Sequence, residues 1–418
     1  MSTYTVVTIL VAISAFFSYL NARFLKLSGT IGIVTIATIA SILIIVFGES
    51  IPSVNRFINA LTAHMDLSDT LLDTMLGFLL FAGSLNFDIN RLKGQIKPVL
   101  ILSTIGVVLS TAIFGALFYV VSMLIHIQVP FVYCLLFGAL ISPTDPVAVS
   151  SILKKSKIPK HLETIITGES LFNDGIGLVL FITLSQIARQ RKVEIPFGKI
   201  AQLFCTEVFG GLILGLIMAV IIYRLMKAVE DFQTIIILSL ALVMSLTVLC
   251  SLLHFSGPLS VVTAGLYIGS HDLTSDEQGS RTRQFMERFW KLIDELMNTI
   301  LFVMIGLQLL KLPFVDDYWR SGLLAIVVIL IARGLSVWLP VTLLKRTLDL
   351  NYKSIFILTW AGLRGGISIA LALSLRESKY KELIIASCYF VVIFSIIVQG
   401  LTLNKVIRLA LNKKEPEP

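Results

Sequence analysis

A polar cluster in the stretch TGESLFNDGIGLVLF has residue types and a spacing that suit the binding of a small cation. On a helix, Ser170 and Asp174 lie one turn apart on one face, so a hydroxyl stands beside a carboxylate. Hard cations favour oxygen ligands of this kind. Glu169 and Asn173 share the adjacent face, and the amide of Asn173 carries no titratable charge. We therefore predict Asp174 as the group that holds either a cation or a proton, although Ser170 also suits helix packing as a small residue.

Charged residues inside apolar segments give a second argument. There are five of them: Asp145, Glu169, Asp174, Arg333 and Arg364. A charge at the centre of a membrane helix costs about 2.5–3.5 kcal/mol on insertion scales, so each should pair, meet water or bind an ion. If each arginine holds one carboxylate ionised, one carboxylate remains and needs a mobile partner. A proton or a monovalent cation would serve, as in an exchanger. For Glu169 we predict an ion pair, with Arg333 as the more suitable partner.

The elements that must position these residues are predicted membrane helices. The 418 residues are 56% hydrophobic and 14% charged, with a mean hydropathy of +0.90. The apolar runs approach the roughly 20 residues of a membrane helix, which excludes a soluble domain and an outer-membrane barrel. We predict an all-α polytopic membrane protein in the lipid bilayer of the cell (inner) membrane. Residues 1–418 form one membrane transporter domain, in which 407–418 is a short cytoplasmic tail.

We expect about thirteen spans and derive their orientation from the basic residues. The predicted spans are Tyr4–Leu25, Thr30–Phe47, Leu71–Phe87, Ile96–Ile125, Phe131–Leu153, Leu162–Ala188, Ile200–Met226, Thr234–Leu253, Pro258–Ser270, Phe289–Leu310, Gly322–Leu344, Ser354–Leu375 and Leu383–Val406. With the N-terminus outside, 22 of the 34 Lys and Arg residues face the cytoplasm and 10 face outward. The positive-inside rule therefore places the C-terminus in the cytoplasm. The net charge of +8 follows from this topology, so no nucleic-acid partner is expected.

Two predicted spans are interrupted near their middles. The fifth, FVYCLLFGALISPTDPVAVSSIL, contains Pro143 and Pro146, and each removes a backbone donor from the helix. The twelfth, SIFILTWAGLRGGISIALALSL, has three glycines around Arg364, which loosen the helix. Matched breaks in two halves favour a transporter of inverted repeats with its site at the bilayer midplane, where unwound backbone at Thr144 and Asp145 offers carbonyl ligands. Two unrelated kinks are the alternative.

Two stretches make a resemblance to a known family recognisable. SPTDPVAVSSILKKSKIPKHLETIITGESLFNDGIGLVLF resembles the cation–proton antiporter family, in the branch of bacterial NhaP-type antiporters and animal Na+/H+ exchangers. WAGLRGGISIALAL is similar to the twelfth-helix signature of that branch, and the order of spans fits over nearly the whole chain. The resemblance implies a thirteen-helix fold in which helices five and twelve are unwound and cross near mid-membrane. It also implies a homodimer with an elevator-like motion of a core domain.

The resemblance also assigns roles to the residues singled out above. Five residues are expected to bind the ion and the proton: Asp174, Ser170, Thr144, Asn173 and Asp145. Of these, Asp174, Ser170 and Thr144 are expected to hold Na+. The structural group comprises Glu169 paired with Arg333, and Arg364, which stabilises the unwound crossing. The family associates an Asn–Asp pair, here Asn173 and Asp174, with electroneutral one-for-one exchange. Some relatives carry a glutamate on the third helix where this chain has Ala82, which leaves the choice of cation open.

Together these patterns predict a secondary active transporter that exchanges Na+ or Li+ for H+, without a cofactor. A K+/H+ or mixed monovalent cation antiporter on the same scaffold is an alternative. A channel-like or sensory membrane protein without coupled exchange is a further one. The sequence contains no nucleophile–base pair, HExxH motif or phosphate-binding glycine loop, so an enzyme is not expected.

Overall fold

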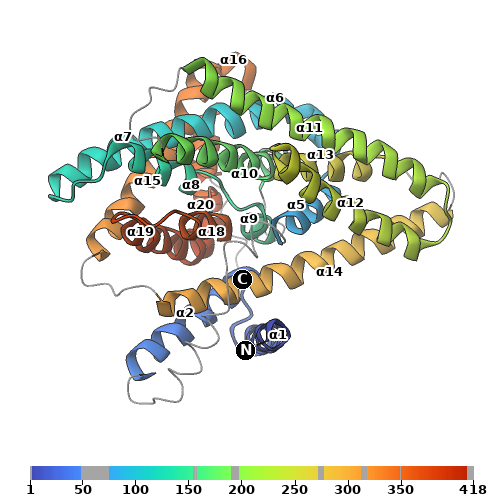
Figure 1. Ribbon diagram of the computed structural model, residues 1–418, viewed down its shortest axis with the longest axis horizontal. Coiled ribbons are helices and arrows are strands. Elements are labelled where there is room, and N and C mark those ends of the chain that lie inside the picture. Colours follow the sequence, from blue (N-terminus) through green and yellow to red (C-terminus); the bar gives the residue numbers. More distant parts are fainter. Residues whose placement is uncertain are drawn as a thin grey trace.

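The structure is a computed structural model, and all regular secondary structure in the residues that it describes is helical. These residues are 2–48, 75–153, 156, 158–189, 197–271, 277–311, 318–348 and 350–411. Seven of their helices are long and apolar enough to cross a bilayer, and three further apolar helices are shorter (Figure 1). The prediction of an all-α, multi-pass membrane fold is confirmed.

The helices follow the predicted spans closely. The first half of the chain contains α1 (Thr3–Leu20), η1 (Asn21–Leu25), α2 (Gly29–Gly48), α5 (Leu76–Leu85), α6 (Ile89–Ile101), η3 (Leu102–Gly106), α7 (Val107–Leu124), α8 (Phe131–Ile141), α9 (Pro146–Leu153) and α10 (Lys160–Arg189). The second half contains α11 (Phe197–Lys227), α12 (Phe232–Leu253), α13 (Gly257–Ser270), α14 (Glu277–Gln308), η4 (Leu309–Lys311), α15 (Trp319–Leu343), α16 (Lys345–Leu348), α17 (Tyr352–Trp360), α18 (Gly366–Leu373), α19 (Lys381–Phe394), η5 (Ser395–Gln399) and α20 (Gly400–Ala410). A count of thirteen spans is consistent with these helices. The first residues of the predicted third span, 71–74, and most of the predicted tail, 412–418, lie outside the described residues.

The tenth predicted span starts later than the helix that contains it. We predicted Phe289 as its first residue, whereas α14 begins at Glu277. Figure 1 shows α14 as one long helix below most of the others in this view, with α2 beside it. The N-terminal half of α14 is rich in charged residues, and part of it lines a large polar cavity described below. The helix is therefore longer than the apolar segment from which we predicted its start.

Both predicted breaks are present, and they contact each other. The fifth span is interrupted between α8 and α9, and Pro146 occupies the first position of α9, where a missing N–H costs no hydrogen bond. The twelfth span is interrupted between α17 and α18. The backbone N–H of Asp145 in the first break donates to the carbonyl of Leu363 in the second, at 2.8 Å. The Asp145 carboxylate also accepts from the N–H of Ala148, at 3.1 Å, and so caps α9.

Gly365 allows the two breaks to approach this closely. A Cβ atom at this position would overlap the carboxyl group of Asp145. We therefore expect Gly365→Ala to push the breaks apart and to destabilise the protein by about 1–3 kcal/mol, the usual range for overpacking. A melting temperature measured in detergent tests this. Gly94→Ala is the matched control, because nothing lies within 4 Å of its added Cβ, and this variant should melt no lower than the unchanged protein.

The helix that carries the polar cluster, α10, lies at the centre of the fold. It contacts both halves of each interrupted span and also the helices α5, α6, α7, α11 and α13. By contrast, α11 and α12 expose large apolar side chains such as Phe209 and Ile237, which suits contact with lipid. The fold therefore buries α10 and both breaks together, away from the bilayer.

Candidate ion-binding site

Four neighbouring polar residues of α10 are almost completely buried. The exposed fractions are 1% for Glu169, 2% for Ser170, 0% for Asn173 and 2% for Asp174. Buried polar groups require partners, because each unpaired donor or acceptor loses its hydrogen bonds to water. The partners of these four residues therefore indicate what each of them does.

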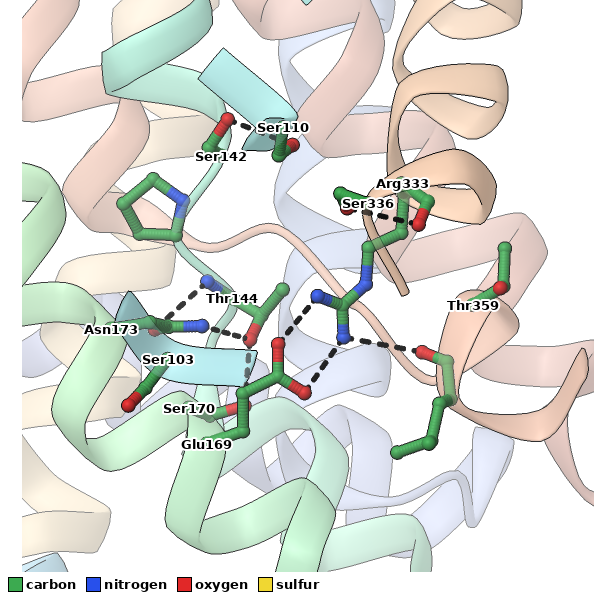
Figure 2. Close-up of polar contacts among 12 residues, drawn as sticks. Ser103, Ser110, Ser142, Thr144, Glu169, Ser170, Asn173, Arg333, Ser336 and Thr359 are labelled. Atoms are coloured by element: carbon green, nitrogen blue, oxygen red, sulfur yellow. Dashed lines mark hydrogen bonds and ion pairs between the residues drawn. The ribbon is translucent and has the colours of Figure 1, made fainter. Parts of the chain in front are cut away.

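Asn173 and Ser170 bind the unwound segment of the fifth span at Thr144. The amide nitrogen of Asn173 donates to the Thr144 hydroxyl at 2.8 Å, and its oxygen accepts from the Thr144 backbone N–H at 3.3 Å. The Ser170 and Thr144 hydroxyls are 2.7 Å apart (Figure 2). The amide of Asn173 thus replaces helical backbone bonding at the break and fixes Thr144 against α10.

Glu169 forms a bidentate ion pair with Arg333 of α15. The two nitrogen–oxygen distances are 2.5 Å and 2.9 Å, and both side chains are buried (Figure 2). Arg333 also donates to the carbonyl of Leu358 in α17, at 3.3 Å. A two-point arginine–carboxylate contact is among the stronger polar interactions in proteins, so the charge of Glu169 is committed to this pair.

Arg364 satisfies the backbone of the broken fifth span. Its Nη1 donates to the carbonyl oxygens of Ser142 and Pro143, the latter at 2.8 Å, and its backbone N–H donates to Ser395 at 2.8 Å. From the sequence we predicted a carboxylate partner for each arginine, whereas Nη1 of Arg364 binds two backbone carbonyls. The reason is physical: the break deprives those carbonyls of helical donors, and a guanidinium supplies donors in a fixed fork.

Asp174 differs from Glu169 because part of its carboxylate has no protein partner. Its Oδ2 is buried and has no hydrogen bond within the described part of the chain. The charges that act on it are those of Asp145 and Arg364. Asp174 lines a small cavity of about 30 Å³ together with Thr144 and Asp145, while Ser170 lies beside it through its bond to Thr144. The wall of this cavity is mostly apolar, but with the oxygens of these residues in it, a cavity of this volume has room for one or two waters or a small ion.

A second and much larger cavity, which the sequence did not reveal, adjoins this one. We call it the polar funnel: it measures about 950 Å³ and is lined by residues of α5, α6, α10 and α14 among others. It reaches the exposed side chains of Arg91 and Lys291. Three residues, Leu79, Pro146 and Asn298, line both cavities. The funnel therefore extends from exposed residues at the protein surface to residues that also line the cavity at Asp174.

Eight of the funnel's polar residues lie on α14, at the start of the predicted tenth span or in the polar sequence just before it. Glu287, Lys291, Asp294 and Asn298 follow one another at helical spacing, which places them on one face of α14. This regular spacing across the boundary between polar and apolar sequence was the signal that could have revealed the funnel wall.

Comparison with known proteins gives consistent matches over the whole chain. Residues 9–409 match the family model described as sodium/hydrogen exchanger, transmembrane. The Na(+)/H(+) antiporter NhaP of Pseudomonas aeruginosa is 38% identical over 406 residues, which cover 95% of each chain. The Na(+)/H(+) antiporter NhaH of Halobacillus aidingensis is 29% identical over 391 residues, 93% of each chain.

Among solved structures, the sodium proton antiporter MjNhaP1 from Methanocaldococcus jannaschii at pH 8 has the same fold. The TM-score is 0.78 at 20% sequence identity, and the match covers 99% of this chain and 100% of that one. A match of this extent agrees with the all-helical, multi-pass fold described above. With the family model spanning nearly every residue and a relative at 38% identity, this chain belongs to the transmembrane sodium/hydrogen exchanger family.

Proposed function

We propose that this protein exchanges Na+ for H+ across the membrane, and that both ions occupy Asp174 in turn. The observation that supports this most directly is the contrast between two buried carboxylates five residues apart on α10. Glu169 is neutralised by Arg333, whereas Asp174 keeps a buried oxygen that has no hydrogen-bond partner in the described part of the chain. The two relatives described above are Na(+)/H(+) antiporters, which supports the same pair of ions.

The remaining site residues have supporting roles in this proposal. Thr144 and Asp145 lie at the same cavity as Asp174 and supply further oxygen ligands for Na+. Ser170 and Asn173 hold Thr144 in place through hydrogen bonds, and Ser170 completes the set of hydroxyl ligands when Na+ is bound. All of these ligands are oxygens, which suits a hard monovalent cation.

Coupling follows from the cost of leaving the site empty. An ionised carboxylate without a partner is very unfavourable away from water, so the core of the protein moves readily only when Asp174 carries a cation or a proton. The charges of Asp145, Glu169, Asp174, Arg333 and Arg364 sum to one negative charge whichever groups pair, and one Na+ or one H+ neutralises it. We therefore propose electroneutral exchange of one Na+ for one H+.

The proposed orientation places the N-terminus outside and the C-terminus in the cytoplasm of the cell (inner) membrane. The distribution of basic residues supports it. The funnel then opens to the cytoplasm, because Arg91 and Lys291 at its surface belong to segments assigned to that side. We also propose that the chain acts as one transporter domain with a short tail from residue 407, and assembles as a homodimer.

Ion flux in proteoliposomes tests this function. An imposed pH gradient should collapse on addition of Na+ or Li+, and the rate should be the same with and without a clamped membrane potential. A gradient that collapses without any added cation indicates a channel-like protein and contradicts coupled exchange. A rate that changes with the clamped potential contradicts the one-for-one stoichiometry.

A K+/H+ or mixed-cation antiporter is the second candidate. It is favoured by Ala82, a buried methyl group in the wall of the polar funnel rather than an acid that would help to strip water from Na+. The same flux measurement with K+ and Rb+ decides between the two. Saturation at lower concentrations of K+ than of Na+ would replace our first proposal with this one.

A further inference from the structure

The boundary between the polar funnel and the small cavity at Asp174 contains one polar side chain. Of the three residues that line both spaces, Leu79 and Pro146 are apolar and the third is Asn298. Asn298 is only 6% exposed and lies on α14, a different helix from α10, which carries Asp174. Where the two cavities share a wall, this amide is therefore the polar side chain that an ion moving from the funnel towards Asp174 meets.

The hydrogen bonds of Asn298 fix which of its atoms such an ion meets. Its Nδ2 donates to the backbone oxygen and to the Oδ1 of Asp294, both at 2.8 Å. Both partners are acceptors, so the amide orientation is determined by its contacts. The Oδ1 of Asn298 accepts no hydrogen bond within the described part of the chain. The atom that remains for a passing cation is therefore a carbonyl oxygen.

The charges of the funnel favour cations as far as this point. Its lining includes five acidic residues, Asp88, Glu163, Glu287, Asp294 and Glu295, against three basic residues, Arg91, Arg288 and Lys291. An excess of one sign in a cleft with low-dielectric walls raises the local concentration of the opposite ion. Asp294 stands one helical turn before Asn298, so the acidic wall of the funnel leads directly to the free amide oxygen.

From these contacts we propose that Asn298, held by Asp294, forms a transfer site that takes a partly dehydrated monovalent cation from the funnel and passes it to Asp174. This inference rests on the proposed exchange function and adds a second, transient binding position to it. A neutral carbonyl oxygen replaces a water ligand without holding the ion by a full charge, so the ion can move on to the carboxylate.

The test measures the apparent KM for Na+ separately on the two sides of the membrane, in vesicles of defined orientation. In Asn298→Ala we expect the KM on the funnel side to rise about tenfold, the effect of losing one hydrogen-bond-strength contact to a charged group. The KM on the opposite side and the maximal rate should stay within about twofold of the unchanged protein. Thr299→Ala is the matched control, because Thr299 lines the funnel but not the small cavity, and its KM should not change on either side.

Other outcomes overturn the proposal. An equal rise of KM on both sides places Asn298 in the binding site itself, and a fall in maximal rate with unchanged KM assigns it a purely structural role. If Asn298→Ala does not fold, Asn298→Ser, which keeps a side-chain oxygen, should fold and show a smaller rise of KM that is still confined to the funnel side. A change of KM that is the same on both sides in Asn298→Ser refutes the transfer site. Failure of the unchanged protein to exchange Na+ for H+ contradicts the proposed function instead, so the two failures are distinct.

Discussion

Asp174→Asn is expected to abolish cation–proton exchange while the protein remains folded. The amide has nearly the same shape as the carboxylate, but it neither carries a negative charge for a cation nor takes up a proton at the pH of the cell. Folding should survive, because the Oδ2 of Asp174 has no hydrogen bond to lose and the substitution removes an expensive buried charge. The measurement is Na+-driven collapse of a pH gradient in proteoliposomes, with the melting temperature and the elution volume in detergent recorded for each preparation.

A matched control separates the role of this carboxylate from a general need for acids on α10. Glu163 stands at the start of the same helix and lines the polar funnel, and it is not among the residues that line the cavity at Asp174. Glu163→Gln makes the same chemical change and should leave the maximal rate of exchange within a few-fold of the unchanged protein. Saturable Na+-dependent proton movement by well-folded Asp174→Asn would show that another group carries the ions.

The parts of the site that sequence predicts are those set by local geometry. Helical spacing alone places Ser170 beside Asp174, and two prolines or three glycines within one apolar run predict a break wherever the chain folds. Hydropathy likewise locates the membrane helices, because a bilayer imposes a length and a composition on each of them. These inferences need no knowledge of which segments become neighbours.

The parts that sequence does not predict depend on contacts between distant segments. The amide of Asn173 binds a backbone N–H 29 residues away, and Arg364 donates to carbonyls more than 220 residues before it. Both bonds form because the break in the fifth span leaves backbone groups without helical partners. The packing of distant segments then determines which side chains bond to these groups. A charge count treats Arg364 as a partner for a carboxylate, since it contains no information on unpaired carbonyls.

The polar funnel was missed for a related reason. The charged first half of α14 has the composition of a surface segment, and only its packing against α5 and other helices makes it a cavity wall. The role of Asn298 could not be inferred from its type, because an asparagine within a membrane helix has many uses. It becomes informative once its amide nitrogen is bound to Asp294 and the residue is found between two cavities.

The ion pair between Glu169 and Arg333 gives the prediction with the largest effect on stability. In Glu169→Gln the guanidinium keeps its charge, because arginine does not deprotonate in proteins, and it loses the only carboxylate that the structure shows bonded to it. The Nε of Arg333 is already buried without a partner in the described part of the chain, so no spare contact offsets the loss. Breaking a buried ion pair by removing one partner costs about 3–5 kcal/mol, and we expect a clearly lower melting temperature in detergent.

Two further variants show that burial, rather than the ion pair as such, produces this cost. Glu377 and Lys381 form a pair of similar length, 2.8 Å, but the Glu377 side chain is exposed, so Glu377→Gln should change the stability by no more than about 1 kcal/mol. The double variant Glu169→Gln with Arg333→Gln removes both buried charges and should recover much of the lost stability, because two neutral amides in contact leave no unpaired ion. Two results would contradict this prediction: Glu169→Gln melts like the unchanged protein, or the double variant melts lower than Glu169→Gln alone. In either case the ion pair does not stabilise the contact between α10 and α15. The assignment of Glu169 as a structural rather than an ion-binding carboxylate then fails.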